Sequence, residues 1–272
     1  MNPLDSLLDN KGVFLIEDAF ELLAKIPDGS VDFVNTDPPY PSLEIHREIG
    51  TTTRLKESAG SSNPWFHVIT WDDFPKLLSE VYRVLKNDSA FFLWCDETTA
   101  DVVKCEEGIM DPRTSRLKNG SRACKSGFFY WREWIWAKTS KDGTKLVGGM
   151  GYHGRGTHER LMFFLKGKRK AAVDVLDVMI SPENDDVLFA PRPPYEGPTP
   201  KPPEIASKLL AAYTKPGDLV LDCFAGTGVL GDAALNSDRR FLMADIEDRW
   251  ALPSMKPFVR QTRIPMEPLV QA

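Results

Sequence analysis

LVLDCFAGTGVLG, residues 219–231, is the stretch that decides the fold. LVLDCF has the composition of a buried strand, three glycines at 226, 228 and 231 follow it, and GVLGDAALN (228–236) then begins a helix. The glycines satisfy the pattern G-x-G-x-x-G, and Asp245 ends the next apolar run. Such a turn lets a cofactor approach the backbone, and the acidic residue binds ribose hydroxyls. The pattern leaves two ligands open: the pyrophosphate of a nicotinamide cofactor, or the methionine end of S-adenosylmethionine.

A second informative stretch is VDFVNTDPPY (31–40), an apolar strand that ends in Asp37, Pro38, Pro39 and Tyr40. Consecutive prolines lack N–H donors and hold the chain extended, so the Pro38 carbonyl is free to accept a hydrogen bond. A carboxylate, a carbonyl and an aromatic ring then lie beyond the end of a strand, where open α/β sheets bind ligands. This set suits a planar ring that carries an NH2 group. A plain strand exit stopped by Pro-Pro is the alternative, because so short a match also occurs by chance.

Short apolar runs rich in Val, Ile and Phe recur along the chain between turns and amphipathic stretches, which is the pattern of an open α/β sheet. Apolar residues at helical spacing predict helices over 18–26, 74–86 and 203–214, and a fourth helix is expected over 228–236. Seven runs are expected to be strands: 13–17, 31–36, 90–95, 133–138, 160–166, 219–224 and 240–245.

With 272 residues, 42% of them hydrophobic, the chain can form one large core, and we treat residues 1–272 as a single domain. No run approaches the roughly 18 apolar residues of a membrane span, and the start lacks a signal-peptide pattern, so a cytoplasmic location is expected. Prolines prevent a long helix in the tail, 252–272. Segments rich in Gly, Ser, Pro or charge are expected to form recognition loops or small-lobe insertions at 41–70, 105–127, 141–157 and 170–200.

Charge is distributed unevenly along the chain. Residues 113–170 contain 15 Lys and Arg against three acidic residues, a formal charge of +12, whereas the whole chain carries −5 and the remainder therefore −17. This contrast is expected where one face meets a polyanion, although a solvated basic surface is the alternative. The candidate nucleic-acid contacts are Arg113, Arg116, Lys118, Arg122, Lys125, Lys141, Lys145 and Arg155.

The sequence predicts neither a metal site nor thiol chemistry. The four cysteines, at 95, 105, 124 and 223, form no C-x-x-C pair and are expected to be reduced and mostly buried. His153 and His158 have no carboxylate or thiol cluster nearby, so a structural role is expected rather than metal binding. The aromatic run FFYWREWIW (128–136) is expected to pack mainly in the core, with a minority of its rings able to reach bases.

Taken together, these segments resemble the β class of DNA amino-methyltransferases, bacterial and phage enzymes in which the catalytic motif precedes the cofactor motif. The resemblance covers about residues 12–250 and keeps the order of the parts. IEDAFELLAKIPDGSVDFVNTDPPY (16–40) is similar to the family's opening through D-P-P-Y. REWIWAKTS (132–140) and THERLMFFLKG (157–167) resemble later strands, interpreted as scaffold.

The cofactor half of the family is matched by PTPKPPEIASKLLAAYTKPGDLVLDCFAGTG, residues 198–228. It is similar to a P-T-x-K-P helix followed by D-P-F-x-G-S-G-T. Cys223, Thr227 and Val229 replace Pro, Ser and Thr of that motif, and Gly197 replaces a His common before P-T. Asp245 stands where the family more often has Glu.

The resemblance implies a circularly permuted, Rossmann-like methyltransferase fold of about seven strands, with a catalytic half at about 12–166 and a cofactor half at about 198–250. It implies S-adenosyl-L-methionine as cofactor, flipped bases of double-stranded DNA as substrate, and no metal. A homodimer is expected because one chain of this length contacts only a few base pairs. Catalysis is assigned to Asp37, Pro38, Pro39 and Tyr40, and the cofactor pocket to Asp18, Ala19, Asp37, Thr199, Lys201, Asp222, Phe224, Ala225, Gly226, Thr227, Gly228 and Asp245.

The family resemblance favours N6 of adenine as the target, because Asp before P-P-Y is more usual for adenine and Ser for cytosine N4, which is the alternative. Methylation at carbon 5 of cytosine needs a cysteine, commonly in Pro-Cys, and the chain has no such pair. A nucleotide-dependent oxidoreductase would explain the glycines but not TDPPY, and it would normally place its glycine motif first. A catalytically silent DNA-binding regulator would explain the charge segregation alone.

Overall fold

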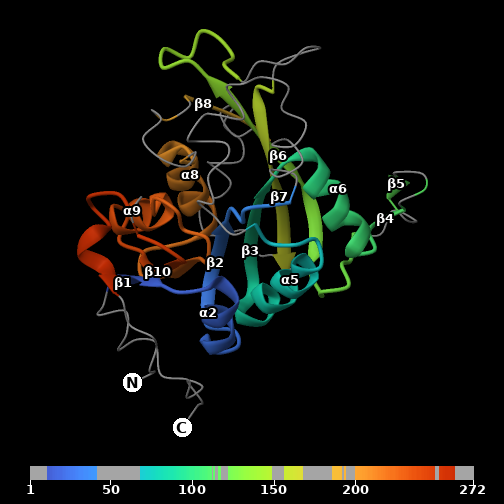
Figure 1. Ribbon diagram of the computed structural model, residues 1–272, viewed down its shortest axis with the longest axis horizontal. Helices are drawn as coiled ribbons and strands as arrows, with labels where there is room; N and C mark the ends of the chain where they lie inside the picture. The colour runs from blue at the N-terminus through green and yellow to red at the C-terminus, as the bar shows by residue number, and fades with distance from the viewer. Residues whose placement is uncertain are drawn as a thin grey trace.

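The computed structural model describes residues 11–41, 68–111, 113, 116–117, 122–148, 156–167, 186–191, 193, 200–248 and 251–260. They form one open nine-stranded sheet and a separate two-stranded ribbon, with helices on both faces of the large sheet (Figure 1). The strand order of the large sheet is β11 (Val259–Arg260), β1 (Gly12–Ile16), β10 (Arg240–Asp245), β9 (Leu219–Asp222), β2 (Val31–Thr36), β3 (Leu85–Cys95), β7 (His158–Lys166), β6 (Phe129–Thr139) and β8 (Val187–Pro191).

Most strands of the large sheet run in the same direction, so their carboxyl ends lie along one edge of the sheet. From β11 to β3 every neighbouring pair is parallel, and β7 then runs antiparallel to both β3 and β6. Because β8 is parallel to β6, eight of the nine strands run in the same direction. Their carboxyl ends therefore meet at one edge, where ligands bind in open α/β sheets.

Segments far apart in the sequence are neighbours in this sheet. β1 pairs with β10, and β2 pairs with β9 through Phe33 opposite Val220 and Val34 opposite Leu221. The start of the chain and its last third therefore build one sheet. This confirms the circularly permuted order expected from the sequence.

Two helical layers cover the sheet (Figure 1). α8 (Pro203–Tyr213) and α9 (Val229–Leu235) pack on one face. α2 (Ala19–Lys25), α5 (Asp73–Val84) and α6 (Glu97–Glu106) pack on the other. The strands serve both cores because their side chains alternate: Phe91 and Leu93 point to the α2 side, whereas Phe92 and Trp94 point to the α8 side.

All seven strands and all four helices expected from the sequence are present, with shifts at their ends. The helix expected over 74–86 ends at Val84, and β3 begins at once with Leu85. The polar residues 86–89 interrupt the apolar pattern early in β3, and Asp88 among them has a left-handed φ of 62°. β8 and β11 are additional, short edge strands, each paired on one side only.

Two of the segments expected to be recognition loops or small-lobe insertions contain regular structure. The 105–127 segment includes the end of α6 and a ribbon of β4 (Met110–Asp111) with β5 (Arg116–Leu117), and β8 lies within 170–200. α6 is short of apolar residues at helical spacing, since only Ala100 and Val103 among its apolar residues are buried. Its start is stabilised instead by the Asp96 carboxylate, which accepts the Thr99 N–H at 2.8 Å.

The four cysteines are free, and three of them are buried, as expected. Cys105, on α6, is the half-buried one. Within the described ranges, no helix is both long and apolar enough to cross a membrane.

The pairing of β1 with β10 leaves no room for a side chain at Gly12. A Cβ built there would lie 2.5 Å from the Phe241 carbonyl oxygen, a backbone atom that cannot rotate away. We expect Gly12→Ala to lower the free energy of unfolding by about 1–3 kcal/mol in urea denaturation. Gly156→Ala is the matched control, because a Cβ there meets nothing within 4 Å. Equal stability of the two variants would contradict the close approach.

Candidate active site

The catalytic and cofactor motifs meet at the edge where the parallel strands end. Asp37 directly follows β2, Asp222 ends β9 and Asp245 ends β10, and these three strands are consecutive neighbours in the order β10, β9, β2. The side chain of Thr36 donates from Oγ1 to Asp222 Oδ1 at 2.6 Å. This buried hydrogen bond joins the strand that carries Asp37 to the strand that enters the glycine turn.

The glycine turn after β9 is shaped by bonds to β10. The Ala225 N–H donates to the Ala244 carbonyl at 2.9 Å, and the Gly226 N–H donates to Asp245 Oδ2 at 2.8 Å. Gly226 and Gly228 have positive φ values of 51° and 80°, which side-chain-bearing residues rarely adopt. Gly228 then precedes α9 as its N-cap. The sequence pattern therefore predicted a real strand, turn and helix unit.

Asp222 is a buried carboxylate whose described partners are neutral donors. Besides the Thr36 hydroxyl, Oδ1 accepts the Phe224 N–H at 3.1 Å. Burial raises the pKa of Asp222 to about 7. Burial also raises the pKa of Asp245, although the N–H groups of Gly226 and of the residues after Asp245 oppose this rise.

Asp18 and Ala19 lie beside the end of β10. Ile16 pairs with Asp245, and the Glu17 N–H donates to the Asp245 carbonyl at 2.9 Å. Asp18 is exposed and caps α2, because its Oδ1 accepts the N–H of Phe20 at 2.8 Å. Ala19 is buried beneath the helix start. Asp18 is thus held in place while part of its carboxylate still faces solvent.

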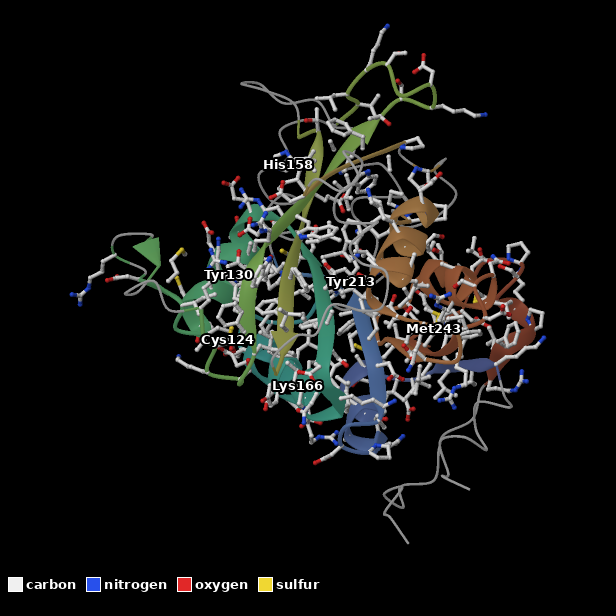
Figure 2. The ribbon with its side chains drawn as sticks, turned by 180° about the vertical axis from the view of Figure 1, so that it is seen from behind. Cys124, Tyr130, His158, Lys166, Tyr213 and Met243 are labelled. Carbon is white, nitrogen blue, oxygen red and sulfur yellow. The ribbon has the colours of Figure 1, made fainter. Side chains whose placement is uncertain are left out.

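Asp37 is ion-paired to Lys201, which lies immediately before α8. Lys201 Nζ is also 3.0 Å from Glu159 Oε2 of β7, and the other oxygen of Glu159 is 2.7 Å from Lys138 Nζ of β6. Burial raises the pKa of Asp37, and the Lys201 ammonium opposes the rise. Figure 2 labels His158, the residue before Glu159, at one end of β7 and Lys166 at the other end.

The two prolines and Tyr40 continue from Asp37. The Pro39 carbonyl accepts the Ile69 N–H at 2.9 Å, whereas no N–H of the described residues donates to the Pro38 carbonyl. Tyr40 is half-buried against the core on the α2 side. Burial raises the pKa of its hydroxyl, so Tyr40 remains neutral at physiological pH.

The structure does not place Thr199 and Lys201 at the cofactor pocket to which they were assigned. Thr199 lies outside the described residues. Lys201, assigned to the methionine end of the pocket, directs its ammonium to Asp37 and Glu159. Sequence reasoning did not identify Glu159 and Lys138, which it treated as scaffold. The available signal was a pair of charged residues within apolar strands, where charges are rare unless paired.

Several cations of the basic segment, residues 113–170, already have partners within the protein. Arg122 is half-buried and donates to the Trp131 carbonyl at 2.6 Å. Arg132 pairs with Asp186, and Arg160 pairs with Glu133. Lys118, Arg155 and the side chain of Arg116 lie outside the described residues. The candidates with exposed side chains are Arg113, Lys125, Lys141 and Lys145.

The other sequence features separate into core and surface. Phe128, Tyr130 and Trp136 are buried, as expected for most of the aromatic run, whereas Phe129 and Trp131 are exposed. His158 is exposed at the start of β7, and His153 lies outside the described residues. Within the part of the chain that the structure describes, no group of three His, Cys, Asp or Glu residues could hold a metal ion.

Solved structures share this arrangement of strands and helices. PvuII DNA methyltransferase, which is cytosine-N4-specific, matches with a TM-score of 0.58 and 17% identity over 88% of this chain and 83% of that one. A protein from Thermus thermophilus, described as a DNA modification methylase and solved with S-adenosyl-L-methionine, matches with a TM-score of 0.55 and 22% identity over 88% and 89%. The fold is therefore that of DNA methyltransferases.

Sequence comparison gives the family. YhdJ, a DNA adenine methyltransferase of Escherichia coli K12, is 26% identical over 250 residues, which are 86% of this chain and 78% of YhdJ. The profile of the N6/N4 DNA methylase family matches residues 31–252. The chain belongs to this family of DNA methylases, and the resemblance inferred from its motifs is confirmed.

The raised pKa of Asp222 generates a prediction about stability and pH. The folded protein keeps this proton up to a pH of about 7, whereas the unfolded chain loses it near 3.8. The stability contributed by the proton is therefore fully present below the unfolded pKa and is lost as pH rises through the folded pKa. Asp222→Asn retains the acceptor oxygen but cannot ionise. We expect the variant to lose less stability between pH 4.5 and 8, by an amount on the order of 1.4 kcal/mol per unit of pKa shift.

Urea unfolding of both proteins at the two pH values measures this difference. Identical pH dependence would show that Asp222 has an ordinary pKa in the folded state.

Proposed function

We propose that this DNA methylase transfers a methyl group from S-adenosyl-L-methionine to the N6 amino group of an adenine flipped out of duplex DNA. The observation that carries the proposal is the 2.6 Å hydrogen bond from Thr36 to Asp222. It keeps Asp37, one residue beyond β2, beside the glycine turn that follows β9. A target amino group on Asp37 and a methyl donor on the turn would then be adjacent.

The glycine turn suits the methionine end of the cofactor. A Cβ added at Gly226 meets nothing within 4 Å, so the backbone there is open to close approach. Asp222 and Asp245 are carboxylates with no cation among their described hydrogen-bond partners, which suits a positively charged donor. When bound, the cofactor supplies an electrophilic methyl group on its sulfonium. We assign its methionine end to Asp222, Phe224, Ala225, Gly226, Thr227 and Gly228.

The ribose and adenine of the cofactor would extend along β10 toward β1. Asp245 ends β10, as expected of the carboxylate that accepts ribose hydroxyls. Asp18 and Ala19 follow β1, whose Ile16 pairs with Asp245, so they lie beyond the ribose position. We assign the adenine end to these two residues.

Asp37 and the Pro38 carbonyl would act on the target base. The lone pair of an exocyclic amino nitrogen is delocalised into the ring, and hydrogen bonds from both of its protons localise that pair for attack on the methyl group. The Pro39 carbonyl is already engaged by Ile69, which leaves the Pro38 carbonyl as the second acceptor. Tyr40 would stack on the base with its ring.

Adenine is favoured by the Asp of the D-P-P-Y motif and by the likeness to YhdJ, a DNA adenine methyltransferase. Cytosine N4 is the second candidate, since PvuII DNA methyltransferase, cytosine-N4-specific, has the same fold. Sequencing that detects modified bases in DNA from cells expressing the chain identifies the base and its recognition site together. N4-methylcytosine in place of N6-methyladenine would overturn the assignment to adenine.

Duplex DNA would be held by the exposed cations of the basic segment, and two copies of the chain would bind a short symmetric site as a homodimer. Arg113, Lys125, Lys141 and Lys145 provide exposed charge in that segment. The turn after β6, which carries Lys141 and Lys145, extends beyond the helices at one end of the sheet (Figure 1). The enzyme would act in the cytoplasm, where its DNA lies.

Replacing the catalytic carboxylate separates transfer from cofactor binding. We expect Asp37→Ala to abolish transfer of radiolabelled methyl groups into DNA, because the target amino group loses its acceptor. Affinity for S-adenosyl-L-methionine in calorimetry should stay within about tenfold, or 1.4 kcal/mol. Asp28→Ala is the control, since Asp28 precedes β2 at the opposite edge and its side chain is 75% exposed. Activity of the Asp37 variant above a few per cent would refute the role.

Binding to DNA should depend steeply on salt. If the basic segment neutralises Z phosphates, log affinity falls with log salt at a slope of about 0.9 Z. We expect joint neutralisation of four exposed cations, Arg113, Lys125, Lys141 and Lys145, to flatten that slope by several units. Light scattering with and without DNA tests the dimer. An unchanged slope would place the contact elsewhere, and a monomer under both conditions would exclude the homodimer.

A further inference from the structure

Four side chains of alternating charge form a row of ion pairs at the candidate active site. It runs from Lys138 on β6 to Glu159 on β7, then to Lys201 before α8, and ends at Asp37 after β2. The side chains of the first three are only 14–17% exposed, and that of Asp37 is 28% exposed. Four separate segments of the sequence therefore place two cations and two carboxylates in one partly desolvated row.

Lys201 is the shared member of this row. Its ammonium contacts the carboxylates of Asp37 and Glu159 and lies 5.2 Å from the centroid of the Trp94 ring. Lys138 lies at the same distance from the ring of Trp136, and the two indoles contact edge to face. Trp94 donates its ring N–H to Asn35 and Trp136 donates its own to the Ala190 carbonyl, so both indoles are fixed.

A lysine paired with one carboxylate alone would compete with the target amino group for that carboxylate. Because the Lys201 ammonium contacts two carboxylates, its ion pair with each one is weaker than an ion pair with a single carboxylate would be. Glu159 suits this task, because it stays ionised: burial disfavours its charge, but Lys201 and Lys138 outweigh burial and lower its pKa to about 2. Lys138 in turn keeps Glu159 in place at 2.7 Å.

We propose that Glu159 is a positioning residue for methyl transfer, which shares Lys201 with Asp37 so that the Asp37 carboxylate stays available to the amino group of the base. The inference rests on the proposed function and adds to it two residues that do not touch the base. Glu159 and Lys138 act through Lys201 and through the effect of their own charges on Asp37. Lys201 thereby belongs to the catalytic carboxylate rather than to the methionine end of the cofactor.

The two sides of this arrangement have opposite effects on Asp37. Glu159 raises the pKa of Asp37, and Lys201 lowers it. Loss of Glu159 should therefore lower the pKa of Asp37, because Lys201 would then pair with Asp37 alone. Loss of Lys201 should raise the pKa of Asp37. The charged or titratable groups that face Asp37 from the elements around it are Lys201, Glu159, Lys138, Tyr40, Asp222 and Cys95.

The test is the pH dependence of methyl transfer by full-length enzyme with duplex DNA. For Glu159→Gln we expect the acid limb of kcat to move down by about one pH unit while the plateau rate falls. For Lys201→Met the acid limb should move up. Asp28→Asn, at the opposite edge of the sheet, should keep the wild-type profile. A merely structural role would lower activity in both variants without moving the limb in opposite directions.

A second readout does not depend on catalysis. Titration of the Asp37 carboxyl by 13C NMR, assigned with Asp37→Asn, follows its pKa in wild type and in Glu159→Gln. Glu159→Asp, which retains the charge, should restore the wild-type titration and guards against misfolding of the other variants. An unchanged Asp37 titration in Glu159→Gln overturns the inference. If the wild-type protein transfers no methyl group to DNA but the pKa of Asp37 still falls in Glu159→Gln, the proposed function is wrong. The sharing of Lys201 between Asp37 and Glu159 is then still supported.

Discussion

The pairing of β2 with β9 is the contact on which the active site depends. It sets Val34 opposite Leu221, and the strand ends that follow are locked by the bond from Thr36 to Asp222. Side chains alternate along a strand, so a slip of one residue would turn Asp37 to the other face of the sheet. The register is protected because both faces of these strands are buried against helices, and any slip would exchange the residues of the two cores.

The carboxylates at the edge formed by these strands have two kinds of partner. Lysine ammonium groups pair with Asp37 and Glu159, whereas hydroxyl and N–H groups donate to Asp222 and Asp245. Burial raises the pKa of Asp37, Asp222 and Asp245 alike. Ionised groups that lack a cation are costly to bury. A positively charged ligand on the glycine turn would reduce that cost. The edge thus combines carboxylates paired with lysines and carboxylates that have no cation among their described hydrogen-bond partners.

Lys138 lies on β6, Glu159 lies on β7 and Lys201 precedes α8, and together they adjoin Asp37 at this edge. Among the described strands of the large sheet, β7 alone runs antiparallel to both of its neighbours, so Glu159 near its start lies beside the carboxyl ends of those neighbours. β6 and β8 extend the sheet away from the cofactor half and present exposed groups such as Lys141 and Phe189. Much of the remaining basic charge in this half pairs with acidic residues of the protein, which limits how many cations can reach phosphates.

The sequence alone determined the seven main strands, the main helices, the family and the positions of Asp37 and the glycine turn. These depend on local apolar periodicity and on turn residues that act within a few positions. Tertiary structure decided the rest. α6 is stabilised by a cap and a few packed residues, and β8 and β11 form only because a neighbouring strand offers its edge. The link between Asp37, Lys201 and Glu159 was likewise hidden, because it joins residues that only the strand order and register bring within reach of one another.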